Sequence, residues 1–235
     1  MFRFAFSWIG YFFKGNLHLK TSYALLQKYS SPIEISRARI DTLSKLLTTN
    51  SRGHYSYDES VNLKDIAKNS IGVDNPAISI QVKCLINQLA LLKEQISSID
   101  KNIKEIMDTL NSNILTIPGI SYTLGAIILS EIGDIHRFSN PTKLLAYAGL
   151  DPSVRQSGKF NATTTRISKR GSKHLRYAIQ RASSLIIWNN NVFYEYYTIK
   201  RSKGKSHNNA VGHVCNKLVR VIFKLLTENI PFNLS

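Results

Sequence analysis

Acidic residues are scarce in this sequence, with 15 Asp and Glu against 31 Lys and Arg in 235 residues. The formal net charge is therefore +16, and the pI is near 9.9. This excess is far larger than solubility requires, so it predicts a polyanionic partner, and nucleic acid fits better than a membrane. Only two cysteines are present, Cys84 and Cys215. They show no paired ligand spacing, which argues against a disulfide or a zinc site and fits a reducing cytoplasm.

The opening stretch MFRFAFSWIGYFFKGN is apolar, but its apolar run is interrupted and no small-residue cleavage site follows it. It is also too short to span a bilayer. A secretory signal and a membrane span are therefore both disfavoured. We interpret the stretch as an aromatic segment that packed against something upstream.

The positive charge is concentrated toward the C-terminus. Residues 151–235 hold 15 Lys and Arg against 3 acids, a balance of +12, which leaves +4 for the rest of the chain. The polyanion site is therefore expected in this part. Residues 17–72 read as several short helices without catalytic motifs. Their acids Asp58, Glu59 and Asp65 are expected to stabilise a helix start through the helix dipole.

Apolar residues from position 78 onward recur at alternating intervals of four and three. They form a heptad seam of 33 residues, about 50 Å of helix at about 1.5 Å per residue. The seam consists of Ile78, Val82, Leu85, Leu89, Leu92, Ile96, Ile99, Ile103, Ile106 and Leu110. The flanking charges do not specify a partner, so the seam could pair within the chain or across a dimer. One long helix of a monomeric bundle is the alternative.

Pro118 and Gly119 interrupt the helical pattern after this seam, and Ser121 can cap a new apolar helix. Helix, Pro-Gly turn and helix is the outline of a nucleic-acid-binding helix-hairpin-helix, in which backbone N–H groups point at a phosphate. We therefore predict that Gly119 and Ser121 contact nucleic acid. An ordinary helical hairpin would use Pro-Gly as well. A short helix follows, with Pro141 in its first turn.

The stretch GLDPSVRQSGKFNATTTRISKRGSKHLR, residues 149–176, concentrates seven Lys and Arg around small residues, with Asp151 as its only acid. It reads as an irregular segment to about Ser168, followed by a helix. Gly158 permits a tight turn beside Ser157. In this field Ser157 could attack phosphorus, or the loop could only grip a phosphate. The basic residues that we predict to bind nucleic acid here are Arg155, Lys159, Arg166, Lys169, Arg170, Lys173 and Arg176.

Aromatic residues lie beside a second basic run in WNNNVFYEYYTIKRSKGK. Two interpretations fit them, because they could stack on unpaired bases or pack into a helical core. These residues are Trp188, Phe193, Tyr194, Tyr196 and Tyr197. The histidines of this half show no metal-ligand spacing, and we expect contacts with phosphate or helix ends from His174, His207 and His213.

Several of these motifs occur together, in one order, in a known family. They are the Pro-Gly hairpin, EIGD, YAGL, SGK, ISKRGSKHLR and a terminal HVCNKL helix, with a looser match back to about residue 17. This stretch resembles the C-terminal transposase domain of insertion-sequence transposases related to the Piv DNA invertase, the IS110 group, whose members use an element-encoded bridge RNA. The resemblance implies a serine nucleophile at Ser157 of RQSGK, which attacks a DNA phosphodiester and forms a phosphoserine linkage without ATP. Ser153 is the next candidate.

Members of that family begin with a RuvC-like nuclease domain whose carboxylates bind Mg²⁺, and we find no such domain in this sequence. Its scattered acids supply no strand-borne set of Asp and Glu, so we predict no metal or other cofactor in this chain. We interpret the chain as the coiled-coil and transposase portion of a longer protein, starting at an internal methionine after truncation.

Together these patterns predict an all-α chain. We expect an N-terminal helical segment at 1–75, a coiled-coil helix at 76–113, and a compact basic transposase domain at 114–235 with a helix-hairpin-helix-like start. The predicted function is a serine-dependent DNA transposase or recombinase in the cytoplasm. Its expected partners are DNA, a structured guide RNA and a second copy of the chain, with no membrane. The alternatives are a nucleic-acid-binding module without catalysis and a coiled-coil oligomerisation protein whose basic surface binds RNA.

Overall fold

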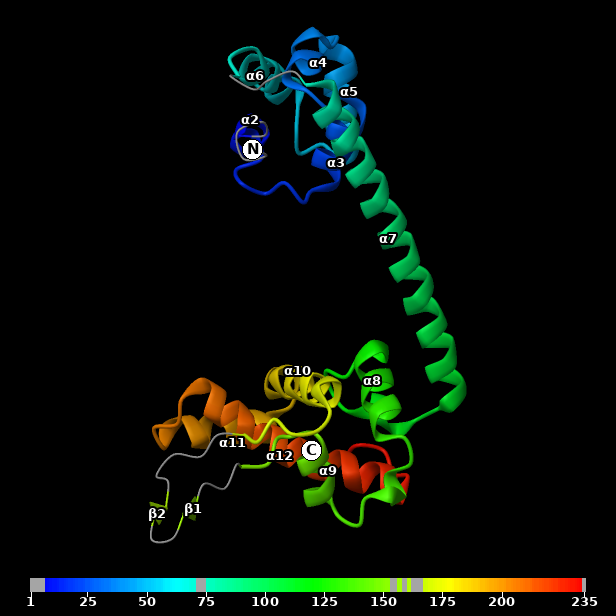
Figure 1. The fold of residues 1–235 in the computed structure, drawn as a ribbon, viewed down its shortest axis with the longest axis vertical. Coiled ribbons are helices and arrows are strands. Elements are labelled where there is room, and N and C mark those ends of the chain that lie inside the picture. Colours follow the sequence, from blue (N-terminus) through cyan, green and yellow to red (C-terminus); the bar gives the residue numbers. More distant parts are fainter. Residues whose placement is uncertain (1–6, 71–74, 153–155, 158–159, 162–166, 234–235) are drawn as a thin grey trace. The chain divides into compact units, whose positions relative to one another are not determined.

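A computed structural model describes residues 7–70, 75–152, 156–157, 160–161 and 167–233 (Figure 1). The described elements are helices apart from one short β-ladder, so the prediction of an all-α fold is confirmed. The chain divides into two compact units, Met1–Ser97 and Ser98–Ser235, and the division falls inside one long helix. Within the described ranges, no helix has both the length and the apolar composition that crossing a bilayer requires.

Short helices build the first unit around one apolar core. They are α2 (Ser7–Phe12), α3 (Lys20–Lys28), α4 (Pro32–Arg37), α5 (Ile40–Ser51) and α6 (Tyr57–Lys68). Phe12 and Phe13 are buried in this core, with ring centroids 5.4 and 5.6 Å from that of Tyr55. In this chain the two rings pack within their own unit, and the interpretation that the segment once packed against something upstream stays untested.

The acids of the first unit stabilise helix α6, as the sequence predicts for two of the three. Ser56 caps the helix, and its backbone N–H donates to Glu59 Oε2 at 2.7 Å. Hydrogen bonds from Ser56 lower the pKa of the Glu59 carboxyl. Asp58 also lies in the first turn. Asp65 instead lies near the end of the helix, where its carboxylate is 3.6 Å from Lys68.

Helix α7 (Pro76–Leu110) contains the whole predicted heptad seam. Val82 is buried, and Ile103 packs against the core of the second unit. Most of the other seam residues are exposed in the described part of the structure, and both the dimer and the monomeric bundle stay predictions. Seven seam residues have exposed fractions of 39% to 59%, namely Leu85, Leu89, Leu92, Ile96, Ile99, Ile106 and Leu110.

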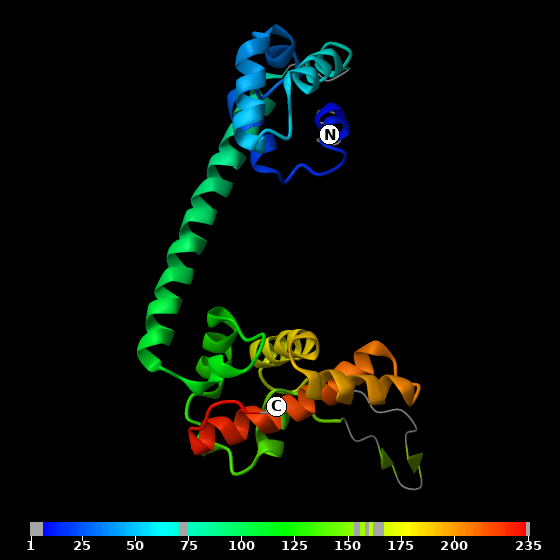
Figure 2. The ribbon, with the colours of Figure 1, turned by 180° about the vertical axis from the view of Figure 1, so that it is seen from behind.

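The second unit packs several helices around α10 (Lys173–Asn189). Helix α10 contacts α8 (Tyr122–Ile132), α11 (Asn191–Ser202) and α12 (His207–Glu228), and α9 (Pro141–Tyr147) packs on α12 (Figure 2). Leu175, Ala182 and Ile186 of α10 are completely buried, as are Val214 and Leu218 of α12. These helices share one apolar core, and the described basic residues predicted to bind nucleic acid lie in and beside them. Two 3₁₀ turns, η1 (Asn113–Thr116) and η2 (Ile135–Arg137), connect them.

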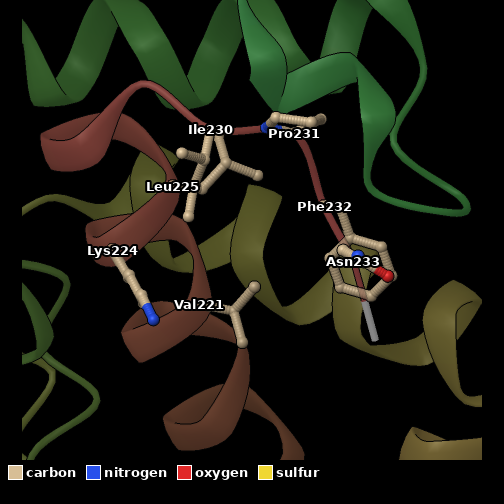
Figure 3. A pocket seen from close by; sticks show the side chains of 7 residues that line it. All are labelled: Val221, Lys224, Leu225, Ile230, Pro231, Phe232 and Asn233. Carbon is tan, nitrogen blue, oxygen red and sulfur yellow. The ribbon is translucent and has the colours of Figure 1, made fainter. Parts of the chain in front are cut away.

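The C-terminal tail folds back beside α12. The backbone N–H of Phe232 donates to Thr116 Oγ1 at 2.8 Å, and the Phe232 ring stacks on Phe193 with centroids 6.5 Å apart. A mainly apolar hollow of about 170 Å³ lies between this tail and α12, lined by Val221, Leu225 and Ile230 among others (Figure 3). None of the residues that we predict as site residues lines it.

Candidate nucleic-acid interface and serine loop

Ser157 lies in a short β-hairpin that interrupts the helical scaffold. Strand β1 (Gln156–Ser157) pairs antiparallel with β2 (Phe160–Asn161), and Ser157 is opposite Phe160 in the ladder. The side chains of these four residues lie outside the described part of the structure, as do Ser153, Arg155, Gly158, Lys159 and Arg166. The described backbone therefore places Ser157 at the end of β1, and the tight turn that the sequence predicts at Gly158 lies outside the described residues.

Polar contacts join the two ends of the segment that carries this hairpin. The Ser168 hydroxyl donates to Asp151 Oδ1 at 2.5 Å, and the Ser168 backbone N–H donates to the Asp151 carbonyl at 2.8 Å. A β-bridge pairs Pro152 with Ile167. We call this arrangement the loop base. It places the two ends of the segment that carries the hairpin side by side.

Two glycines permit the close backbone approach that the loop base requires. Gly149 has a φ of +64°, and a Cβ atom there would lie 2.2 Å from the carbonyl oxygen of Arg170. Gly171 has a φ of +96°, and a Cβ atom there would lie 2.2 Å from the carbonyl oxygen of Tyr147. These separations are far below contact distance, so any larger residue would push the backbone apart.

The start of α10, which follows the loop base, is attached to helix α8 through Glu131. The Ser172 hydroxyl donates to Glu131 Oε2 at 2.6 Å and accepts from the Leu175 backbone N–H at 3.0 Å, which caps α10. Arg137 donates to the Glu131 carbonyl at 3.1 Å. Its guanidinium also lies 4.6 Å from the centroid of the Tyr147 ring. The start of α10 is thereby held against α8 and α9.

The structure brings four predicted basic residues together next to the loop base. Lys169 has a left-handed backbone with φ of 55°, and its N–H donates to the Gly149 carbonyl at 3.0 Å. The side chains of Lys169, Arg170 and Lys173 are exposed. Arg176 is half-buried, and its guanidinium donates to the Ala148 carbonyl at 3.2 Å. Three of these four cations are therefore open to a ligand, while Arg176 also holds the end of α9.

The predicted hairpin contacts lie in a different part of the unit. Ser121 is exposed and caps α8, accepting from the Leu124 N–H at 3.3 Å. Gly119 lies against α10, since a Cβ atom there would be 2.9 Å from Leu185 Cβ. This close packing explains the glycine without a ligand. The contribution of Gly119 and Ser121 to nucleic-acid binding stays a prediction.

Cations of the second unit are rarely neutralised by acids. In the described ranges, ion pairs join Lys68 to Asp65, Lys101 to Glu105 and Lys224 to Glu228, each within one helix. Apart from Lys224, the Lys and Arg side chains described between residues 167 and 233 have no carboxylate within ion-pair distance. A surface with this many unpaired cations attracts polyanions strongly.

Two side chains of α12, His213 and Cys215, have pKa values that are shifted by their surroundings. Burial, together with the nearby charges of Lys200 and Lys205, lowers the pKa of His213. Lys200 and Lys205 therefore give the surroundings of His213 a local excess of positive charge. Burial raises the pKa of the Cys215 thiol to about 11, so this cysteine is protonated near neutral pH and is a poor nucleophile. No cluster of three His, Cys, Asp or Glu side chains that could hold a metal occurs among the described residues.

The aromatic residues of α10 and α11 divide between core and surface. Phe193 is fully buried, and Tyr196 and Tyr197 are partly buried. Trp188 and Tyr194 are exposed, with ring centroids 5.7 Å apart. The core interpretation is therefore confirmed for the first three and wrong for the last two. For the histidines, Tyr197 Oη lies 2.8 Å from His207 Nδ1.

Sequence reasoning missed the residues that build the loop base. Asp151 and Ser168 are 17 residues apart in an irregular segment, so no periodicity relates them. The isolated position of Asp151 as the only acid in a basic stretch was a signal for a specific partner. Gly171 and Glu131 carried no such signal.

Comparison with known proteins finds similar sequences for this part of the chain. Residues 111–198 match the family described as Transposase IS116/IS110/IS902, which covers the hairpin, the loop base and α10. The insertion element IS110 43.6 kDa protein of Streptomyces coelicolor is 22% identical over 208 residues, 87% of this chain and 51% of that protein. The pilin gene-inverting protein of Moraxella bovis is 27% identical over 165 residues, 67% of this chain and 51% of that protein.

A third relative, the insertion element IS116 44.8 kDa protein of Streptomyces clavuligerus, is 27% identical over 146 residues, 61% of this chain and 36% of that protein. The chain thus spans about a third to a half of the length of the relatives it matches. Residues 111–198 of this chain are thus similar to a family of insertion-sequence transposases, and the relatives that it matches are insertion-element and gene-inverting proteins.

Proposed function

We propose that this chain is the coiled-coil and transposase part of a DNA transposase that cuts and rejoins DNA through Ser157. The observation that supports the proposal most is the loop base, which joins the two ends of the segment that carries the serine hairpin next to Lys169 and Arg170 in the family-matched region. The name of the Moraxella relative, a gene-inverting protein, supports recombination as the reaction class.

In the proposed reaction, the Ser157 hydroxyl oxygen attacks a phosphodiester phosphorus. The bond from the serine oxygen to phosphorus forms, the bond from phosphorus to one deoxyribose oxygen breaks, and the serine loses its proton while the released strand gains one. Because the phosphoserine keeps the bond energy, a hydroxyl of another strand can reverse the step and rejoin DNA without ATP. The nearby cations would offset the charge on the phosphoryl oxygens.

The Mg²⁺ implied by the family would need a carboxylate cluster. The described residues bring no three His, Cys, Asp or Glu side chains together, so they do not fit such an ion. No step of the serine reaction is assigned to a metal in this chain. The proposal instead places metal binding in a nuclease domain outside this sequence.

Assembly through α7 is part of the same proposal. Exposed Leu and Ile side chains continue along the seam for most of the helix, and heptad seams are covered by partner helices. We propose a second copy of the chain as that partner, and duplex DNA together with a structured guide RNA as ligands of the basic surface.

The test is a strand-transfer assay with a full-length protein that joins this chain to the N-terminal part of an IS110-group relative. Ser157→Ala should abolish strand transfer and leave DNA affinity nearly unchanged, since one neutral hydroxyl contributes about 0.5–1.5 kcal/mol. Normal DNA binding by the unfused chain without any strand transfer by the fused wild type would favour the alternative, a binding module without catalysis.

A further inference from the structure

One face of helix α10 alternates positive and aromatic side chains. Lys173, Tyr177, Arg181 and Trp188 follow one another at intervals of four, four and seven residues. At about 100° per residue these positions fall within an arc of about 80°, so they form one stripe along the helix. All four are exposed, while the opposite face of α10 is buried in the core.

The aromatic residues of this stripe are unusually open to solvent. Trp188 is 71% exposed and Tyr177 is 57% exposed, and Tyr194 of α11, 46% exposed, lies beside Trp188. Tryptophan is usually largely buried, so a cluster of exposed rings indicates a binding surface. We call Lys173, Tyr177, Arg181, Trp188 and Tyr194 the aromatic stripe.

The charges of the stripe indicate which partner fits. Neither Lys173 nor Arg181 has a carboxylate within ion-pair distance among the described residues. A second copy of the same stripe would bring like charges together, which disfavours self-association through this face. Duplex DNA offers phosphates, but its bases are stacked and paired and present no free ring faces. Unpaired nucleotides offer both phosphates and base faces.

The length of the stripe also suits a single strand. The 15 residues between Lys173 and Trp188 span about 22 Å of helix. At a repeat of about 3.4 Å for stacked nucleotides in one strand, this length accommodates roughly six nucleotides. The stripe therefore has both the chemistry and the reach of a short single-strand track.

We propose that the aromatic stripe binds unpaired nucleotides of DNA or RNA. Tyr177, Trp188 and Tyr194 stack on bases, while Lys173 and Arg181 contact the phosphates between them. The inference deepens the proposed function, on which it rests for nucleic acid as the ligand. It adds that this face, including Lys173, recognises single strands, whereas Lys169 and Arg170 next to the loop base serve the duplex.

The test measures binding of the full chain to three fluorescent probes at one salt concentration: a 12-nucleotide oligo-dT, a 12-nucleotide oligo-U and a 12-base-pair duplex. Trp188→Ala and Tyr177→Ala should each weaken binding of at least one single strand roughly tenfold or more, because each removes a stacking partner. Duplex binding should change less than twofold. The matched control is Tyr57→Ala, which removes a ring that is 51% exposed on the first unit and should change neither.

A second readout follows Trp188 directly. The sequence has two tryptophans, so a Trp8→Phe variant leaves Trp188 as the single source of tryptophan fluorescence. Base stacking should quench that emission on addition of the single strand and leave it unchanged on addition of the duplex. Arg181→Ala should reduce the salt slope of single-strand binding by about 0.7, the contribution of one phosphate contact.

The outcomes separate this inference from the proposed function. Loss of binding to one single strand alone would support the stripe and identify the preferred sugar. Equal loss on duplex and single strands, or equal effects of Trp188→Ala and Tyr57→Ala, would overturn the stripe while leaving duplex binding by the chain intact. If Trp188→Ala changes the sedimentation of the chain but not its binding of single strands, the aromatic stripe contacts another protein chain. That result would also overturn the inference that the stripe binds unpaired nucleotides. Failure to bind any probe would refute the proposed function itself.

Discussion

Replacing Gly171 by alanine should destabilise the second unit strongly, because this glycine allows the segment between the loop base and α10 to contact Tyr147 of α9. A Cβ atom at Gly171 would lie 2.2 Å from the Tyr147 carbonyl oxygen and 3.0 Å from its carbon. That carbonyl accepts the Ser172 N–H at 2.8 Å. Relieving the clash would therefore shift the backbone that positions the start of α10.

The expected magnitude combines two effects. A left-handed backbone costs a residue with a Cβ atom about 1–2 kcal/mol. Overpacking costs about a further 1–3 kcal/mol. Gly204→Ala is the matched control, since Gly204 also has a positive φ, +75°, but no atom within 4 Å of a Cβ there. The control should lose about 1–2 kcal/mol, and Gly171→Ala about 2–5 kcal/mol.

Thermal unfolding followed by circular dichroism at 222 nm measures this difference. For a chain of this size, about 1 kcal/mol shifts the melting temperature by about 2–4 °C. Gly171→Ala should thus melt several degrees below Gly204→Ala and should also weaken duplex binding. Equal melting temperatures for the two variants would refute the reasoning that the Tyr147 contact, rather than backbone strain alone, requires glycine.

Three further predictions concern charge and assembly. The logarithm of duplex affinity should fall linearly with the logarithm of salt concentration, with a slope of roughly −0.9 for each phosphate engaged. The chain should sediment as a dimer or larger, and Leu92→Asp with Ile99→Asp should dissociate it, because the seam would then bury charge. The pKa of His213, measured by NMR titration, should lie below 6.5, since burial and nearby lysines favour the neutral ring. Its contribution to stability should be present above pH 6.5 and decline as the pH falls toward the folded-state pKa.

Each of these has a distinct contradictory result. A flat salt titration would remove electrostatic binding as the basis of nucleic-acid affinity. A wild-type monomer at micromolar concentration would show that the seam is covered by something other than a second copy. A His213 pKa above its ordinary value would mean that an unrecognised acid neutralises the lysines. Conversely, bound oligonucleotide should raise this pKa, because phosphate offsets the lysine charges.

Features that depend on local sequence could be predicted well. The heptad seam places a helix at 78–110, and the structure has one at Pro76–Leu110. Ser121 caps α8, and Pro141 lies at the start of α9. These features follow from periodicity and from hydrogen bonds within a few residues. The β-ladder at Ser157 is not predicted, because the sequence reads as an irregular segment to about Ser168.

Features that depend on contacts between distant segments could not be predicted. The hydrogen bonds from Ser168 to Asp151 and from Ser172 to Glu131 span 17 and 41 residues. The exposure of Trp188 is also a tertiary property, because α10 has a second, mainly apolar face that fills the core instead. Periodicity identifies an aromatic residue on a helix, but only packing decides which face is covered.

The central claim is that Ser157 forms a covalent bond to DNA, and detection of a protein–DNA adduct tests it most directly. The full-length protein that joins this chain to the N-terminal part of a relative is incubated with labelled donor DNA, denatured and separated by size. We expect the wild type and Ser153→Ala to retain labelled DNA through denaturation, and Ser157→Ala to bind the same DNA but retain none. An adduct of normal yield in Ser157→Ala would contradict the account, and its loss in Ser153→Ala would move the nucleophile to that residue.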